Sequence, residues 1–175
     1  PNYHVLDGFM QFVRYLGCQP VMDWSLPVAS EDSAWAAQHL SDKHHNVVIS
    51  PCSSHSLRNW SARRYAALID AIGQHYDAHI ILTASPADKE KAFVADIERL
   101  CRSPVLNLAG EDTLKQLWAL LEQVDLVISP DSGPLHMAGA VATPVIGLMA
   151  ASNPKRSGSY QYPELAVNKY PQACQ

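Results

Sequence analysis

The 175-residue sequence lacks long apolar runs and a recognisable export signal. No segment approaches the roughly 18 consecutive apolar residues of a membrane-spanning helix, and the N-terminus shows no basic-then-apolar signal pattern. The composition is otherwise ordinary, with 47% hydrophobic and 17% charged residues. We therefore expect one well-packed soluble domain. Because the chain begins at Pro1 instead of Met, we take it for a fragment or a processed product.

Cysteine and histidine patterns that would hold a metal or a disulfide framework are also missing. The four cysteines, at positions 18, 52, 101 and 174, form no C-x-x-C pair, and the eight histidines form no i, i+4 pair with an acid. We expect no metal site, no resident cofactor and a reducing, cytoplasmic setting. A formal charge of -4 disfavours a nucleic-acid surface spread over the whole domain, but it allows a local basic pocket.

Several motifs with a defined chemistry are absent. No G-x-G-x-x-G follows the first expected strand, no G-x-x-x-x-G-K-[ST] occurs, and no G-x-S-x-G nucleophile elbow is present. Nicotinamide binding, P-loop hydrolysis and serine hydrolase chemistry are therefore disfavoured. A nucleotide-sugar epimerase is disfavoured for the same reason, since it needs the nicotinamide fingerprint.

What the sequence does contain, from residue 46 onward, is an alternation of short apolar runs and amphipathic stretches. We expect strands over 47–49, 79–83, 105–108, 126–129 and 145–148. Helices are expected to start at Ser61, at Ser85-Pro86, at Thr113 and after Ser132, with two more over 5–16 and 31–40. Five strands alternating with four helices predict an α/β fold with a doubly wound parallel sheet. After residue 154 the pattern turns polar and irregular, without a clear final helix.

A polar loop over 51–60 follows the first expected strand. In a doubly wound sheet, ligands bind beyond the carboxyl ends of the strands. The hydroxyl groups of Ser53 and Ser54 suit phosphate oxygens, and the guanidinium of Arg58 can hold two such oxygens at once. The alternative is an ordinary solvated loop, which spacing alone favours equally.

A second candidate loop, over 109–113, carries Glu111 and Asp112 just before a helix. An acid such as Asp112 could accept hydrogen bonds from a base or a ribose hydroxyl. The simple preference of acids for helix starts explains both residues equally well.

The most specific stretch, SPDSGPLHMAGA over 129–140, joins a buried strand to a helix. Gly133 lets a phosphate approach the backbone at the positive end of the helix, and the Ser132 hydroxyl can cap that helix or donate to an oxygen. Asp131 would repel a diphosphate, so we expect it to orient the loop or to meet a sugar hydroxyl. His136, on the first helical turn, flanks the same place. The alternative is a plain helix cap with a surface histidine.

With these residues in place, the sequence resembles glycosyltransferase family nine, the heptosyltransferases of bacterial lipopolysaccharide core assembly. The resemblance covers roughly residues 47–160. It rests on ISPCSSHSLRNWSARRYAALIDAI, on LNLAGEDTLKQLWALLEQVDLVISPDSGPLHMAGAVATPVIGL and on the later NPKRSGSY. The Asp-Ser/Thr-Gly-x-x-His element before an Ala-rich helix is the family's most specific mark.

The resemblance implies the C-terminal half of a GT-B glycosyltransferase, a Rossmann-like domain that holds the donor ADP-heptose. It implies inverting transfer without a metal, at the cytoplasmic face of the inner membrane, with peripheral membrane contact and no nucleic-acid partner. The lipopolysaccharide core acceptor and the catalytic base would belong to a missing N-terminal domain. We therefore expect N-terminal helices and a connecting segment over 1–45, the nucleotide-sugar-binding domain over 46–160, and an irregular tail of a truncated chain over 161–175.

The resemblance also implies a set of donor-binding positions and no catalytic residue in this half. These positions are Ser53, Ser54 and Arg58 at the phosphates, Asp112 at the adenosine, and Asp131, Ser132, Gly133 and His136 at the diphosphate and sugar. Arg58 stands where the family has lysine, and the acid that contacts the ribose is left open between Asp88 and Glu90. We expect no transfer activity from this chain alone. The alternative is a non-catalytic nucleotide-binding or partner-docking domain of the same fold.

Overall fold

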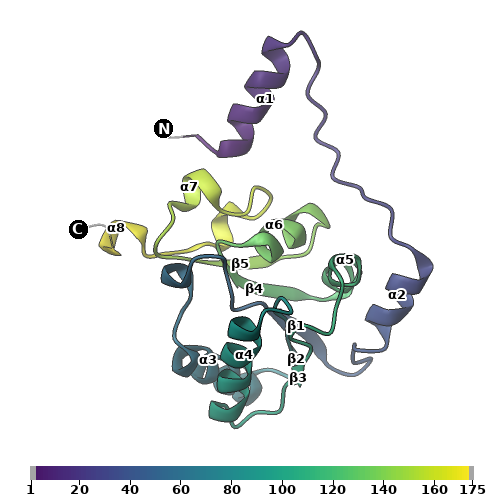
Figure 1. Ribbon diagram of the computed structural model, residues 1–175, viewed down its shortest axis with the longest axis vertical. Coiled ribbons are helices and arrows are strands. Elements are labelled where there is room, and N and C mark those ends of the chain that lie inside the picture. The colour runs from purple at the N-terminus through teal and green to yellow at the C-terminus, as the bar shows by residue number, and fades with distance from the viewer. Residues whose placement is uncertain (1–2, 174–175) are drawn as a thin grey trace.

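A parallel β-sheet with helices on both faces is the centre of the computed structural model, which describes residues 3–173 (Figure 1). The described strands form a six-stranded sheet in the order β3-β2-β1-β4-β5-β6, and every pairing is parallel. This confirms the predicted doubly wound α/β fold. The expectations that involve Pro1, Cys174 and Gln175 lie outside the described residues.

The strands are β1 (His45–Ile49), β2 (Ala78–Leu82), β3 (Leu106–Asn107), β4 (Leu126–Pro130), β5 (Val145–Met149) and β6 (Val167–Asn168). The main helices are α1 (Val5–Tyr15), α2 (Ser30–Ala37), α3 (Ala62–His75), α4 (Asp88–Leu100), α5 (Leu114–Gln123) and α6 (Gly133–Ala140). Short helical segments are η1 (Ser56–Arg58), α7 (Pro154–Ser157), η2 (Pro163–Leu165) and α8 (Tyr170–Ala173).

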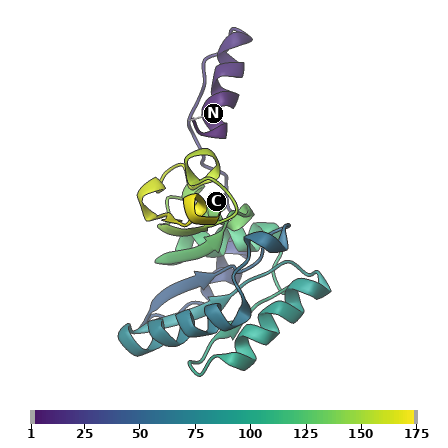
Figure 2. The same cartoon turned by 90° about the vertical axis from the view of Figure 1, so that its left-hand side faces the viewer.

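Alternating side chains on each strand build two separate cores. Val47 and Ile49 point to the face covered by α3 and α4, whereas Val48 points to the face covered by α2, α5 and α6. In Figure 2 the sheet is seen with α3 and α4 below it. Because both faces of the central strands are covered, these strands read in the sequence as short, continuous apolar runs.

The chain reverses its winding direction between β1 and β4, which are hydrogen-bonded neighbours in the sheet. Val47, Val48 and Ile49 pair with Leu126, Val127 and Ile128. The chain leaves β1 toward β2 and leaves β4 toward β5, so the loops after these two strands diverge on opposite sides. Such a switch point leaves a crevice at the carboxyl ends of the strands. The loop after β1 and the turn after β4 flank it.

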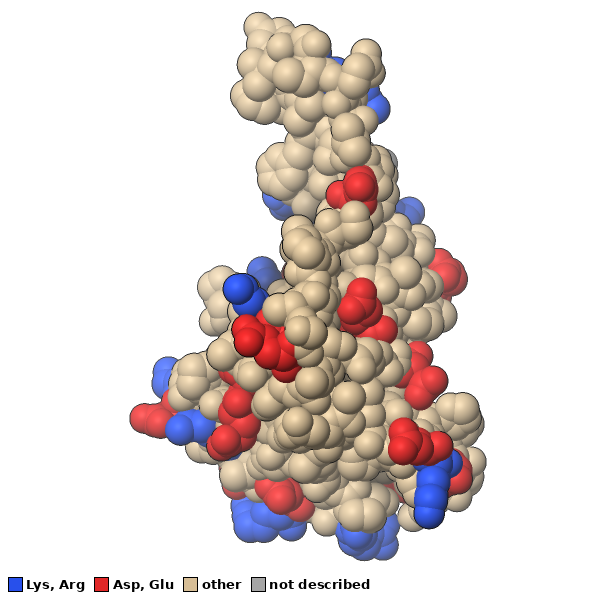
Figure 3. Space-filling model, turned by 90° about the vertical axis from the view of Figure 1, so that its right-hand side faces the viewer, with Lys and Arg blue, Asp and Glu red and all other residues tan. Residues whose placement is uncertain are grey.

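The N-terminal helix α1 stands apart from the sheet and is joined to α2 by an extended segment (Figure 1). None of its residues is buried. His4 Nε2 lies 3.0 Å from the carbonyl oxygen of Gly158, and the Tyr160 hydroxyl donates to Asp7 Oδ1 at 2.9 Å. On the face shown in Figure 3, the upper part, formed by this extension, is largely uncharged, and charged side chains gather lower down.

None of the helices in the described part combines the length and the apolar character needed to cross a bilayer.

Three details differ from the expectations. The helix expected at Ser85-Pro86 begins at Asp88, because Ala87 is its N-cap and the Ser85 N–H is bonded to the Glu90 carboxylate at 3.0 Å. Leu114 continues the helical spacing of Leu117, Leu120 and Leu121, which predicts a buried position, but it is 73% exposed because it is the first residue of α5 and lies at the cleft. The segment after residue 160, expected to be irregular, contributes β6, which pairs with β5.

Two buried threonines allow a matched test of hydrogen bonding in the core. Thr143 Oγ1 donates to the Leu121 carbonyl at 2.6 Å, whereas Thr83 Oγ1 has no hydrogen-bond partner among the described residues. We expect Thr143→Val to lower the free energy of unfolding by about 1–2 kcal/mol, because it orphans a buried carbonyl. Thr83→Val should leave it unchanged or raise it. Urea unfolding of both variants measures this, and equal losses would contradict the assignment.

Candidate functional site

The loop after β1 is held in shape by its own polar side chains. Ser53 N–H donates to Asn59 Oδ1 at 2.9 Å, and the Ser53 hydroxyl donates to the His55 carbonyl at 2.9 Å. The Tyr65 hydroxyl reaches the Pro51 carbonyl at 3.3 Å from α3. The hydroxyl of Ser54 has no such bond within the described residues, and Ser54 is exposed. Of the two predicted phosphate-binding hydroxyls, Ser54 is therefore the one left available.

The turn after β4 presents the start of α6. Ser132 is the N-cap by position, but its hydroxyl pairs with Ser129 Oγ at 2.8 Å and makes no capping bond to the helix. Gly133 is the first helical residue, and a Cβ placed on it would meet no atom within 4 Å. The fold itself thus does not require glycine here. The open space lies where backbone N–H groups of the first turn remain free to bind an anion.

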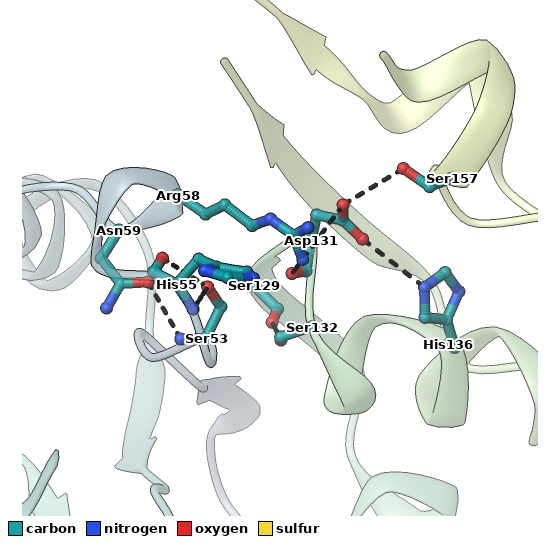
Figure 4. A network of polar contacts seen from close by, with 9 residues as sticks. All are labelled: Ser53, His55, Arg58, Asn59, Ser129, Asp131, Ser132, His136 and Ser157. Atoms are coloured by element: carbon teal, nitrogen blue, oxygen red, sulfur yellow. Dashed lines mark hydrogen bonds and ion pairs between the residues drawn. The ribbon is translucent and has the colours of Figure 1, made fainter. Parts of the chain in front are cut away.

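Asp131 connects three loops at the carboxyl edge of the sheet (Figure 4). Arg58 Nη1, from the loop after β1, lies 3.2 Å from the Asp131 carbonyl and 3.5 Å from its Oδ2. His136 Nε2, on α6, lies 3.7 Å from Oδ1. The Ser157 hydroxyl, after β5, donates to Oδ2 at 3.1 Å. One carboxylate therefore sets the relative positions of side chains from three separate strand ends.

Asp131 is buried, with 8% of the residue exposed, yet its surroundings favour the ionised carboxylate. Burial acts to raise its pKa, but hydrogen bonds from His136, Ser152 and Ser157 together with the Arg58 charge outweigh burial and hold the pKa below its usual value. A carboxylate with a low pKa is a poor proton acceptor. Asp131 is therefore suited to orienting its neighbours and poorly suited to acting as a general base.

A cleft of about 330 Å³ opens beside this turn. It is bounded by the loop after β1, the end of β2, the start of α5 and the start of α6. Five of the predicted positions line it, namely Ser53, Ser54, Asp112, Ser132 and Gly133. Arg58 and Asp131 instead line a neighbouring hollow of about 620 Å³. His136 lines neither and touches Asp131 from α6.

The cleft has an acidic wall that the sequence only partly indicated. Asp112 and Glu90 both line it, whereas Asp88 lies outside on the exposed start of α4, beside Lys91. Burial raises the pKa of Asp112 to about 6. Cys52, which also lines the cleft, has a pKa raised to about 12 by burial first and by Glu90 second, which favours the neutral thiol.

Other residues at the site escaped prediction. Ser50 and Thr83 line the cleft where their strands end, and Ser152 and Ser157 reach Asp131 from the segment after β5. The position of Ser50 and Thr83 directly after apolar runs was the available signal. No signal existed for Ser152 and Ser157, because their contacts depend on how the segment after β5 folds back.

A parallel sheet in this strand order, with polar loops at its switch point, is the architecture of a Rossmann-like ligand-binding domain. The sequence profile of glycosyltransferase family 9 (heptosyltransferase) matches residues 2–175. The chain belongs to this family. This match confirms the family that the sequence motifs predicted.

Individual relatives agree with the family match. The chain is 41% identical to the lipopolysaccharide core heptosyltransferase OpsX of Haemophilus influenzae, over 98% of this chain and 50% of that protein. A solved family 9 glycosyltransferase from Veillonella parvula superposes with a TM-score of 0.83 at 21% identity, over 95% of this chain and 49% of the other. E. coli heptosyltransferase WaaC, solved with ADP-2-deoxy-2-fluoro heptose, gives 0.60 at 18% identity, over 85% and 45%. The chain thus spans about half the length of these proteins, as expected for one half of a GT-B enzyme.

The role of Asp131 as the link between the loops predicts a loss of stability on Asp131→Asn. The amide keeps the shape but loses the charge that Arg58, His136 and Ser157 contact, so we expect the free energy of unfolding to fall by about 1–3 kcal/mol, toward the low end because Arg58 is partly exposed. Since the pKa of Asp131 is lowered in the fold, the difference is fully present above the unfolded pKa of about 3.9 and is lost as the pH falls through the lower folded pKa. Urea unfolding at pH 7 and at a series of pH values below about 4 measures it. A variant as stable as the parent at pH 7 would contradict the assignment.

Proposed function

We propose that this chain is the donor-binding domain of an inverting heptosyltransferase that adds heptose to the lipopolysaccharide core, with ADP-heptose as donor. Membership of family 9 supports the reaction class. The name of the OpsX relative supports the lipopolysaccharide core as acceptor, and the ligand of the WaaC structure supports an ADP-linked heptose as donor. The observation that carries the proposal is the open space before Gly133, beside Arg58 and the cleft.

The differently charged regions of the site match the different parts of a nucleotide sugar. The cleft contains Glu90 and Asp112 and no lysine or arginine among its lining residues, so it suits a nucleoside whose hydroxyl and amino groups donate to carboxylates. The diphosphate then lies at the start of α6 and near Arg58, where free N–H groups and a guanidinium attract anions. The sugar follows toward Asp131 and His136. In this arrangement Glu90, and not Asp88, is the acid that faces the ribose.

The same groups would stabilise the departing diphosphate during transfer. The free backbone N–H groups at the start of α6, beginning with that of Gly133, and the positive charge of Arg58 would act where negative charge develops on the leaving group. An inverting step also needs a carboxylate to take the proton from the acceptor hydroxyl. Asp131 is engaged by Arg58, His136 and Ser157, and Glu90 and Asp112 line the cleft assigned to the nucleoside. In this proposal the base belongs to the part of the enzyme that faces this domain, as the family resemblance implies, and the enzyme works at the cytoplasmic face of the inner membrane.

An alternative function is a nucleotide-binding or partner-docking domain that has kept the fold and lost the reaction. A nucleotide-binding domain of this kind would hold a nucleotide at the same crevice, whereas a partner-docking domain would bind none, so absence of nucleotide binding would favour the docking domain. The two functions also differ in the full-length protein, which transfers heptose only if it is a heptosyltransferase. On both readings this chain alone releases no ADP from ADP-heptose in the presence of a core acceptor.

Calorimetric titration with ADP, UDP and GDP tests donor binding. We expect ADP to bind most tightly, and Arg58→Gln and Gly133→Ala each to weaken it by about tenfold. Gly133→Ala should also raise the free energy of unfolding by about 0.4–1 kcal/mol, because alanine restricts the unfolded chain. The matched control is Arg63→Gln, which removes an exposed guanidinium from α3, outside the proposed site. Unchanged ADP affinity in both site variants would refute the proposed position, and preference for UDP or GDP would change the donor.

The raised pKa of Asp112 predicts pH-dependent nucleoside binding. Ionised Asp112 accepts a hydrogen bond that the protonated acid accepts poorly, so the affinity for adenosine should fall as the pH drops from 7 to 5 through the pKa of about 6. Adenosine is the probe because it carries no titrating phosphate. Asp112→Asn should bind adenosine with the same affinity at both pH values. A pH dependence that persists in this variant would assign it to another group.

A further inference from the structure

Three residues with hydroxyl groups form a row across the carboxyl edge of the sheet, on the face covered by α2, α5 and α6. Thr83 follows β2, Ser50 follows β1, and Ser129 lies near the end of β4. Each comes two positions after a strand residue whose side chain is buried on that face. The strand pairing continues to this row, because the Ser50 N–H donates to the Ile128 carbonyl at 3.0 Å and the Thr83 N–H donates to the Ile49 carbonyl at 3.1 Å. Ser50 therefore has Thr83 on one side and Ser129 on the other.

The three hydroxyl groups differ in their hydrogen bonds, although all three residues are buried. The Ser129 hydroxyl pairs with that of Ser132 at 2.8 Å (Figure 4). Thr83 Oγ1 has no partner among the described residues, and neither has the hydroxyl of Ser50. A buried hydroxyl without a partner destabilises a fold, and native proteins rarely keep one without a reason. Since apolar side chains fit this face of the sheet, the fold alone does not require hydroxyl groups at these two positions.

Both unpartnered hydroxyl groups belong to residues that line the cleft of about 330 Å³. Thr83 Oγ1 is fully covered, whereas the oxygen of Ser50 is not. The strand order places Ser50 between the end of β2, which leads to Glu90, and the end of β4, which leads to Gly133 at the start of α6. In the proposed binding mode the nucleoside lies on the first side and the diphosphate on the second. Ser50 is therefore beneath the point where these two parts of a nucleotide meet.

We propose that Ser50 is a nucleotide-binding residue and that Thr83 positions it from the neighbouring strand. In the complex, the Ser50 hydroxyl donates its hydrogen to an oxygen where the ribose meets the diphosphate, and it accepts a hydrogen bond from Thr83 Oγ1. One hydroxyl can do both, since it has one hydrogen and two lone pairs. Neighbouring strands lie about 4.8 Å apart, so rotation of Ser50 about χ1 can bring its oxygen to Thr83.

This arrangement gives the hydroxyl of Thr83 a partner only when the nucleotide is bound. The stability that the free chain loses through two unpartnered hydroxyl groups is then regained as affinity for the ligand. The proposal rests on the proposed function, because the donor nucleotide supplies the oxygen that Ser50 contacts.

Calorimetric titration of the intact chain with ADP tests the roles of the two residues. Ser50→Ala should weaken ADP binding about three- to tenfold, since it removes one hydrogen bond to the ligand. Thr83→Val should weaken it about two- to threefold, because Thr83 acts through Ser50, and Thr83→Ser should bind as the parent does. The matched control is Thr143→Val, which removes a buried hydroxyl that contacts Leu121 and does not line the cleft. Urea unfolding should show Ser50→Ala and Thr83→Val to be no less stable than the parent.

Two fragments of ADP identify the oxygen that Ser50 contacts. Adenosine supplies the ribose, and inorganic diphosphate supplies the phosphates. A loss of affinity in Ser50→Ala for one fragment assigns the oxygen to that part, and a loss for ADP alone assigns it to the atom that joins the two parts.

Unchanged ADP affinity in Ser50→Ala would overturn the proposal. A loss in Thr83→Val that Thr83→Ser or Thr143→Val shares would also overturn it, because such a loss reports a general disturbance of packing. Failure of the parent chain to bind ADP is a different outcome, which refutes the donor site itself and this proposal with it.

Discussion

The carboxylate of Asp131 is the interaction on which the geometry of the crevice depends. It contacts Arg58 from the loop after β1, His136 from the helix after β4, and Ser157 from the segment after β5. The strands themselves bring only the backbone ends of these loops together. The charged carboxylate aligns their side chains, and its burial makes the alignment strong because few waters compete for it. This aligning role explains why the acidic Asp131 lies beside a site whose other groups are suited to anions.

The charges around this carboxylate are unevenly distributed, with acidic residues in the cleft and a cation in the neighbouring hollow. Glu90 and Asp112 line the cleft, while Arg58 lines the neighbouring hollow together with Asp131. A nucleotide sugar has the same polarity, with donor groups on its nucleoside and negative charge on its diphosphate. On the proposed function, electrostatics would orient the donor before any base-specific contact forms. A donor that entered in reverse would bring its phosphates against two acids.

Local sequence patterns predicted the strands, most helices and the loops that flank the crevice, because doubly covered strands are short apolar runs and ligands bind at their carboxyl ends. The choice between Asp88 and Glu90 required the exact start of α4, which depends on the Glu90 bond back to Ser85. Contacts of Ser152 and Ser157 with Asp131 required the path of the chain after β5. Leu114 fitted the apolar stripe of α5 and is exposed, since helical periodicity does not indicate where the neighbouring layer ends.

On the proposed function, a nucleoside diphosphate sugar lies across the switch point between β1 and β4, and a crystal structure of this chain with ADP would show its position. We expect the nucleoside in the cleft that Glu90 and Asp112 line, with the diphosphate at the start of α6 and within reach of Arg58. ADP bound away from this edge, or with its phosphates in the cleft and its nucleoside beside Arg156, would refute this binding mode.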